Sequence, residues 1–137
     1  MSRTLFLDTS AWVPLLIREE ASQRMWEVKK GAGSLWAWSW LQVETEAALA
    51  RRGATSGAWR TWNQLRGEIT WVSLESSELP TLCALNRAIG LRAADAGHLF
   101  VFERLFSVVS ELELLTLDKE MAEAARGIGL PVHAACP

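Results

Sequence analysis

The sequence predicts one α/β domain of three layers, in which helices cover both faces of a central, mainly parallel sheet of about five strands. Short apolar segments alternate with longer segments of helical periodicity along the whole chain, which is typical of a parallel sheet. The 137 residues are 50% hydrophobic and 22% charged, enough to bury a sizeable core. No repeat or linker divides the chain, so we interpret residues 1–137 as a single domain.

Five segments have the composition of strands. TLFL near the N-terminus is a short apolar run typical of a buried strand, and the segment that begins at Ile69 is rich in β-branched and aromatic residues. The expected strands are residues 4–7, 34–38, 69–74, 111–117 and 130–133. Binding sites in such sheets form beyond the carboxyl ends of the strands, so the residues that follow the strands are the candidates for a functional site.

Helical segments lie between these strands. Ser39 suits an N-cap and Gly53 follows two arginines at the end of the same helix. The segment LRAADAGHLFVFERLF has an apolar stripe made of Leu99, Phe102 and Phe106. The expected helices are residues 9–17, 21–30, 39–52, 54–66, 76–89, 91–106 and 119–126.

Composition excludes several classes of protein. The formal net charge of −2 does not suit a general nucleic-acid coat, although most basic residues are Arg, the better partner for phosphate. The apolar runs are too short for a membrane span, and Asp8 interrupts the N-terminus too early for a signal peptide. Two cysteines indicate no disulfide framework, so we expect a cytoplasmic protein. The eight Trp are expected mostly in core or interface positions.

Four acidic residues stand beside apolar segments. Asp8 directly follows the first expected strand, and Asp118 follows the strand at 111–117. Asp95 lies one helical turn before Leu99, on the apolar stripe, where an unpaired charge is costly. Glu44 lies on the inward face of its expected helix.

Each acid alone also has a simple structural explanation. Asp8 and Asp118 are placed as helix N-caps, and Asp95 lies where a helix dipole favours an anion. Glu44 either pairs with Arg51 or Arg52 or is solvated. Together, four such acids would repel one another without a cation. Clustered carboxylates suit Mg²⁺ or Mn²⁺, which prefer oxygen ligands, and such an ion orients a phosphate and activates water.

Four motifs in order resemble the PIN domain, and are most similar to the small toxin ribonucleases of the VapC type. They are LDTSAW, VETEAALAR, LRAADAGHL and LTLDKEMAEAARGIGLPV, and together they span nearly the whole chain. The resemblance implies a PIN-like three-layer fold and a Mg²⁺- or Mn²⁺-dependent endoribonuclease that acts as the toxin of a type II toxin–antitoxin pair. It also implies an RNA substrate, a cognate antitoxin and a homodimer.

The resemblance assigns the catalytic and metal-binding acids to four positions: Asp8, Glu44, Asp95 and Asp118. Glu46 is the competing match to Glu44, but it points about 200° around the helix from it. The fourth acid varies in the family, so Asp118 is open to contact through a water. The implied reaction is in-line attack of water on a bridging phosphate of single-stranded or looped RNA, which leaves a 5′-phosphate and a 3′-hydroxyl.

Several neighbouring residues have two open interpretations. Hydroxyl groups beside the assigned ligands either orient a carboxylate or water, or make ordinary turn and strand hydrogen bonds; they belong to Thr9, Ser10 and Thr116. Arg51 and Arg52 either guide RNA or are solvated. Arg92 lies one helical turn before Asp95, so a salt bridge and a phosphate contact are both open. The family usually carries a His at position 98 without needing it for chemistry, so His98 is interpreted as structural.

Two other classes of function compete with the nuclease. A non-catalytic PIN-like module that binds RNA or protein is the first, and the loss of an acid would support it; none is missing. A phosphatase with a nucleophilic Asp8 is the second, but it requires another Asp two residues later, where the chain has Ser10. Cleavage of DNA within the same fold is also open.

Overall fold

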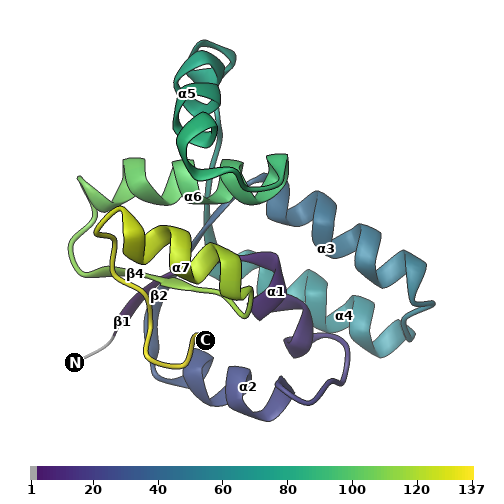
Figure 1. The fold of residues 1–137 in the computed structure, drawn as a ribbon. Helices are drawn as coiled ribbons and strands as arrows, with labels where there is room; N and C mark the ends of the chain where they lie inside the picture. The colour runs from purple at the N-terminus through teal and green to yellow at the C-terminus, as the bar shows by residue number, and fades with distance from the viewer. Residues whose placement is uncertain (1–2) are drawn as a thin grey trace.

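The computed structural model describes residues 3–137 and confirms an α/β fold with a parallel central sheet (Figure 1). The strands are β1 (Arg3–Leu7), β2 (Ala32–Trp38), β3 (Ile69–Val72) and β4 (Leu112–Leu115). Their order across the sheet is β3-β2-β1-β4, and every neighbouring pair is parallel. The first strand in sequence therefore lies inside the sheet, with β4 beside it at one edge.

The expected fifth strand at 130–133 is reduced to one bridge, between Leu114 and Val132. The Leu114 N–H donates to the Pro131 carbonyl at 3.0 Å, and the His133 N–H donates to the Leu114 carbonyl at 2.9 Å. Pro131 has no N–H, so pairing of this segment is limited to these contacts. The sheet consequently has four strands within residues 3–137.

Seven α-helices lie within residues 3–137: α1 (Thr9–Trp12), α2 (Ser22–Lys30), α3 (Trp40–Arg51), α4 (Ser56–Leu65), α5 (Leu79–Ile89), α6 (Ala93–Phe106) and α7 (Lys119–Gly127). The helix expected at 9–17 is shorter than predicted, because the chain tightens into a 3₁₀ turn at Val13–Leu15. Pro14 in that turn has no N–H to continue an α-helix. The segment expected to be helical from residue 76 likewise begins as a 3₁₀ turn at Ser76–Glu78.

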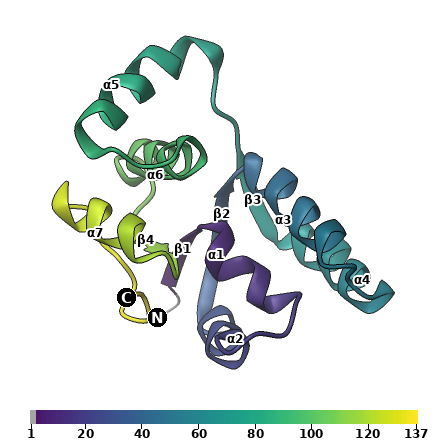
Figure 2. The same cartoon turned by 45° about the vertical axis from the view of Figure 1, so that its right-hand side comes forward.

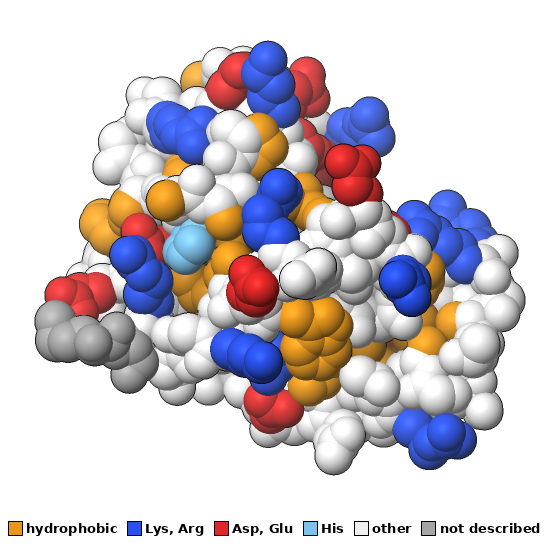
Figure 3. Space-filling view, turned by 90° about the horizontal axis from the view of Figure 1, so that it is seen from below, with side chains coloured by type: hydrophobic (Ala, Val, Ile, Leu, Met, Phe, Trp, Pro, Cys, Tyr) orange, Lys and Arg blue, Asp and Glu red, His pale blue; other side chains and the backbone are white. Residues whose placement is uncertain are grey.

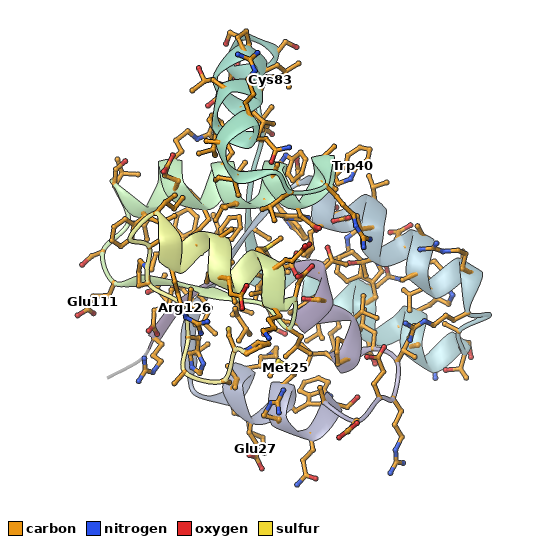
Figure 4. The ribbon with its side chains drawn as sticks, in the orientation of Figure 1. Met25, Glu27, Trp40, Cys83, Glu111 and Arg126 are labelled. Carbon is orange, nitrogen blue, oxygen red and sulfur yellow. The ribbon has the colours of Figure 1, made fainter. Side chains whose placement is uncertain are left out.

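The sheet separates two apolar cores. Leu5 and Leu7 of β1 point toward the core beneath α1 to α4, whereas Phe6 points toward the core beneath α6 and α7, as the two-residue repeat of a strand requires. Figure 2 shows the two groups of helices on opposite sides of the strands. In Figure 4, Met25 points from α2 toward the sheet and Glu27 points away. Both faces of the sheet are therefore covered.

Two predictions about large apolar side chains need qualification. Leu99 and Phe102 are fully buried, but Phe106 is 40% exposed, so the apolar stripe of α6 ends before its last residue. Trp62 is fully buried, as expected, whereas Trp40 is 44% exposed. Within residues 3–137, no helix has the length and apolarity needed to cross a membrane.

A glycine on α6 allows the end of β2 to approach that helix closely. A Cβ atom added at Gly97 would lie 2.5 Å and 2.6 Å from ring atoms Cζ3 and Cη2 of Trp38. Real Cβ atoms do not come so close to a ring, so any larger side chain would push Trp38 away. The contact fixes the position of α6 relative to the sheet.

We expect Gly97→Ala to destabilise the protein by about 1–3 kcal/mol, because the added methyl group overpacks the Trp38 contact. Gly127→Ala at the end of α7 is the matched control, since a Cβ there meets nothing within 4 Å. The control should be neutral or stabilising by up to about 1 kcal/mol. Urea unfolding measures both; equal stabilities for the two variants would contradict the packing argument.

Candidate active site

Two of the four acids lie at the same edge of the sheet because their strands are parallel neighbours. Leu7 at the end of β1 pairs with Leu115 at the end of β4. The Asp8 N–H continues this ladder by donating to the Leu115 carbonyl at 3.0 Å. Asp118 follows β4 after a short turn, so the topology brings both carboxylates to the carboxyl edge of the sheet.

Hydroxyl groups hold the Asp8 side chain, which is only 3% exposed. Its Oδ2 atom accepts hydrogen bonds from Ser10 Oγ at 2.5 Å and Thr116 Oγ1 at 2.8 Å. These hydroxyls in turn accept from the backbone N–H groups of Leu117 at 2.9 Å and Asp118 at 3.0 Å. No hydrogen bond within residues 3–137 involves Oδ1, so one oxygen is anchored and the other is left for a ligand.

Glu44 reaches the same region from α3. Its Oε1 atom lies 2.7 Å from Thr9 Oγ1, which donates to it, and 2.5 Å from His98 Nε2. Burial alone would raise the pKa of Glu44, but the hydrogen bonds from His98 and Thr9 outweigh burial and lower it. The side chain is therefore held as a carboxylate, although it is half-buried.

Glu46 points elsewhere, as its helical position predicts. Its Oε2 atom accepts hydrogen bonds from Trp62 Nε1 at 2.9 Å and Arg66 Nη1 at 3.1 Å. Glu46 thus braces α3 against α4. Of the two candidates on α3, only Glu44 is joined to α1 and α6.

Asp95 lies in the first turn of α6, where burial and the charges of the other acids change the pKa of its side chain. Desolvation by burial is the largest cause that raises its pKa, and the charges of Asp8, Asp118 and Glu44 raise it further. The net result is a pKa of about 6, against an ordinary value of 3.8. Asp95 therefore lies within the electrostatic field of the other three acids.

The N-cap explanation also holds for two of these acids. Asp8 caps α1, and Asp118 caps α7 by accepting from the Met121 N–H at Oδ1, 3.2 Å away. Asp118 uses one oxygen for this cap, as Asp8 and Glu44 use one oxygen for their anchors. A capping role and a ligand role are therefore compatible.

The chemistry of these side chains fits a hard divalent cation, because all four donors are carboxylate oxygens and three of the carboxylates keep one oxygen without a hydrogen bond in residues 3–137. The side chains do not converge on a point: within the same residues, no group of three or more Asp, Glu, His or Cys side chains is arranged to hold a metal ion. The four side chains thus match a divalent cation in donor type, in charge and in their position near the sheet edge.

The three arginines proposed to contact RNA have different surroundings. Arg51 and Arg92 are exposed. Arg52 pairs with Glu19 at 2.6 Å and borders a hollow of about 360 Å³ that Thr9 and Ser10 also line. Basic and acidic side chains are interspersed over the face in Figure 3, so no broad basic field is visible there. Single basic side chains close to the acids, such as Arg52, are therefore the candidates for contact with a phosphate.

His98 has a partner that the sequence interpretation does not identify. It is fully buried on α6, and its ring contacts Glu44 rather than only packing between helices. The available signal was its position three residues after Asp95, which places both side chains on one side of the helix. Its partner is 54 residues away in sequence, and nothing local indicates that pairing.

Comparison with solved structures identifies the fold. No family model matches the sequence, and no curated protein matches it either. VapC20 of Mycobacterium tuberculosis, described as a sarcin–ricin loop cleaving toxin, superposes with a TM-score of 0.70 at 17% identity over 97% of this chain and 99% of that one. The chain has the PIN-like fold of this VapC toxin.

Two further structures agree with the VapC-like fold. A toxin–antitoxin complex from Klebsiella pneumoniae matches with a TM-score of 0.69 at 15% identity, over 97% of this chain and 99% of that one. PAE2754 from Pyrobaculum aerophilum matches with a TM-score of 0.63 at 22% identity, over 91% of this chain and 81% of that one. These structures confirm the fold predicted from the sequence, and at such low sequence identities the likeness shows the fold alone.

The raised pKa of Asp95 predicts a pH-dependent gain in stability for Asp95→Asn in EDTA. A folded-state pKa above the unfolded value means that the folded protein binds more protons between pH 4 and 6, so stability falls as pH rises through this range. Above pH 6 the charged Asp95 is destabilising by about 1 kcal/mol after allowance for solvent screening. The variant should melt about 3–5 °C higher at pH 7.5.

The same variant should gain little at pH 4, where Asp95 is protonated in the folded protein. Glu27→Gln is the control, because it removes an exposed carboxylate from the outer face of α2. Differential scanning calorimetry at both pH values measures the effect. An equal shift at pH 4 and pH 7.5 would contradict the raised pKa of Asp95.

Proposed function

We propose that this protein is a metal-dependent endoribonuclease and the toxin of a type II toxin–antitoxin pair. The observation that carries the proposal is the gathering of Asp8, Glu44, Asp95 and Asp118 near the carboxyl edge of the sheet, where burial first, and then the charges of the other three acids, raise the pKa of Asp95 to about 6. Such crowding of like charges is costly for a purely structural site, and strongly perturbed groups in one place are typical of functional sites.

The four acids would hold Mg²⁺ or Mn²⁺, with Asp118 in contact directly or through a water. When bound, the ion supplies charge neutralisation for a phosphate and lowers the pKa of water, as divalent cations do in phosphodiester hydrolysis. The chain's own contribution is orientation. Ser10 and Thr116 hold Asp8, and Thr9 and His98 hold Glu44, each through one carboxylate oxygen.

Hydrolysis at this site would add water to a bridging phosphate and release the 3′-oxygen, leaving a 5′-phosphate and a 3′-hydroxyl. Arg52 borders the hollow beside Thr9 and Ser10, so its guanidinium is suited to a flanking phosphate once it exchanges its partner Glu19. Exposed Arg92, at the N-cap of α6 beside Asp95, is suited to a second phosphate contact. Single-stranded or looped RNA is the proposed substrate.

A cognate antitoxin and a homodimer are the proposed partners. The relevant support is the Klebsiella pneumoniae neighbour, which is a toxin–antitoxin complex and shares the fold over nearly its full length. Exposed apolar side chains, among them Trp40 and Val108, offer area for such contacts. The second candidate function, a non-catalytic binding module, is favoured by the incomplete convergence of the carboxylates.

RNA cleavage by the purified chain, free of co-purified partner, tests the proposal. Cleavage should occur with Mn²⁺ or Mg²⁺ and stop in EDTA. Asp95→Asn should lower the rate by about 100-fold or more, because it removes a ligand charge while keeping side-chain size. Glu27→Gln, which removes a remote carboxylate, should cleave at the wild-type rate. A folded wild-type protein that cleaves no RNA and binds neither metal would favour the binding module instead.

A further inference from the structure

His98 makes one specific polar contact in an otherwise apolar setting. The side chain is fully buried, and its Nε2 atom lies 2.5 Å from Glu44 Oε1. Its other ring nitrogen, Nδ1, is buried and has no hydrogen-bond partner within residues 3–137. Within residues 3–137, the His98 ring therefore makes one hydrogen bond, and Glu44 is its partner.

These contacts define which ring nitrogen carries the hydrogen. An ionised carboxylate only accepts hydrogen bonds, so Nε2 is the donor. A second N–H at Nδ1 would be a buried donor without an acceptor, which is costly. Hydrogen-bond partners thus assign the tautomer with hydrogen on Nε2 alone.

Aromatic packing fixes the ring in this orientation. The edge of Trp38 meets His98 with ring centroids 5.0 Å apart and planes at 80°, and Trp38 itself stacks on Trp40 at 6.0 Å. Gly97 leaves room for Trp38 against α6. Figure 4 shows Trp40 at the start of α3, close to the beginning of α6. His98 consequently has little freedom to turn away from Glu44.

Glu44 is held at one oxygen by two donors from different elements. Thr9 Oγ1 donates from α1 and His98 Nε2 donates from α6, both to Oε1. Oε2 receives no hydrogen bond within residues 3–137. The arrangement fixes the carboxylate while leaving Oε2 available.

We propose that His98 is a positioning residue, whose Nε2–H fixes the Glu44 carboxylate so that Oε2 is presented to the site shared with Asp8, Asp95 and Asp118. The inference rests on the proposed nuclease function and adds a residue that the four-acid pattern does not contain. His98 touches neither substrate nor ion in this role; it acts only through Glu44.

A double-mutant cycle in the RNA-cleavage assay separates positioning from packing. His98→Leu keeps the volume of the ring but has no donor, whereas His98→Gln places an amide N–H near the position of Nε2. We expect the Leu variant to lose about 10–100-fold in rate, as changes to groups that orient metal ligands typically do, and the Gln variant to retain most of it. His133→Gln is the matched control and should cleave normally.

The second arm of the cycle repeats His98→Leu in a Glu44→Ala background. If His98 acts through Glu44, its loss there should add almost nothing, because the interaction is already absent. Equal rates for the Leu and Gln variants, or fully multiplicative effects in the Glu44→Ala background, would overturn the positioning role. Cleavage by the wild-type protein tells failure of the nuclease proposal apart from failure of the positioning role. An inactive wild type would remove the nuclease proposal, and the positioning role with it.

A spectroscopic measurement does not depend on activity or on a folded His98 variant. In ¹⁵N-labelled His133→Gln protein, His98 is the one remaining histidine. Nitrogen NMR at a single pH should show the hydrogen on Nε2, and Glu44→Ala should shift that resonance. An Nε2 atom without hydrogen, or an Nε2 resonance unmoved by Glu44→Ala, would overturn the inference.

Discussion

The placement of four carboxylates, three of them part-buried or buried and held at one oxygen, near one edge of the sheet is the constraint on which the site depends. A protein that packs Asp8, Asp95, Asp118 and Glu44 at one sheet edge must hold each against its neighbours. It does so with anchors to single oxygens: two hydroxyls on Asp8, a hydroxyl and an imidazole on Glu44, and a backbone N–H on Asp118. Asp95 has no such anchor in residues 3–137, and burial together with the charges of the other acids raises its pKa to about 6.

The positions of the strand-end acids could be predicted because they depend on local pattern. Asp8 and Asp118 each follow an apolar run, and parallel pairing of β1 with β4 brings the two together. Helical angle predicted that Glu44 and Glu46 could not both face the site, and the match to the family motif chose Glu44. In the structure Glu46 accordingly turns toward Trp62. Resemblance to a known family supplied the assignment that local pattern left open.

Other features depended on contacts that no local pattern encodes. The bond between His98 and Glu44 joins α6 to α3, and the close approach of Gly97 to Trp38 joins α6 to β2. The expected strand at 130–133 failed because Pro131 lacks an N–H, and Phe106 lies past the point where α6 leaves the core. Tertiary packing, and not local sequence, determines these contacts and the ends of these elements.

The central claim is that the four carboxylates form one cation site, and diffraction from crystals grown with Mn²⁺ tests it most directly. Anomalous difference density should show an ion at the carboxyl edge of the sheet, bound by oxygens of Asp8 and Asp95 and by Glu44 or Asp118. Well-ordered crystals in millimolar Mn²⁺ with no anomalous peak at this edge, or with Mn²⁺ bound only elsewhere, would contradict the account.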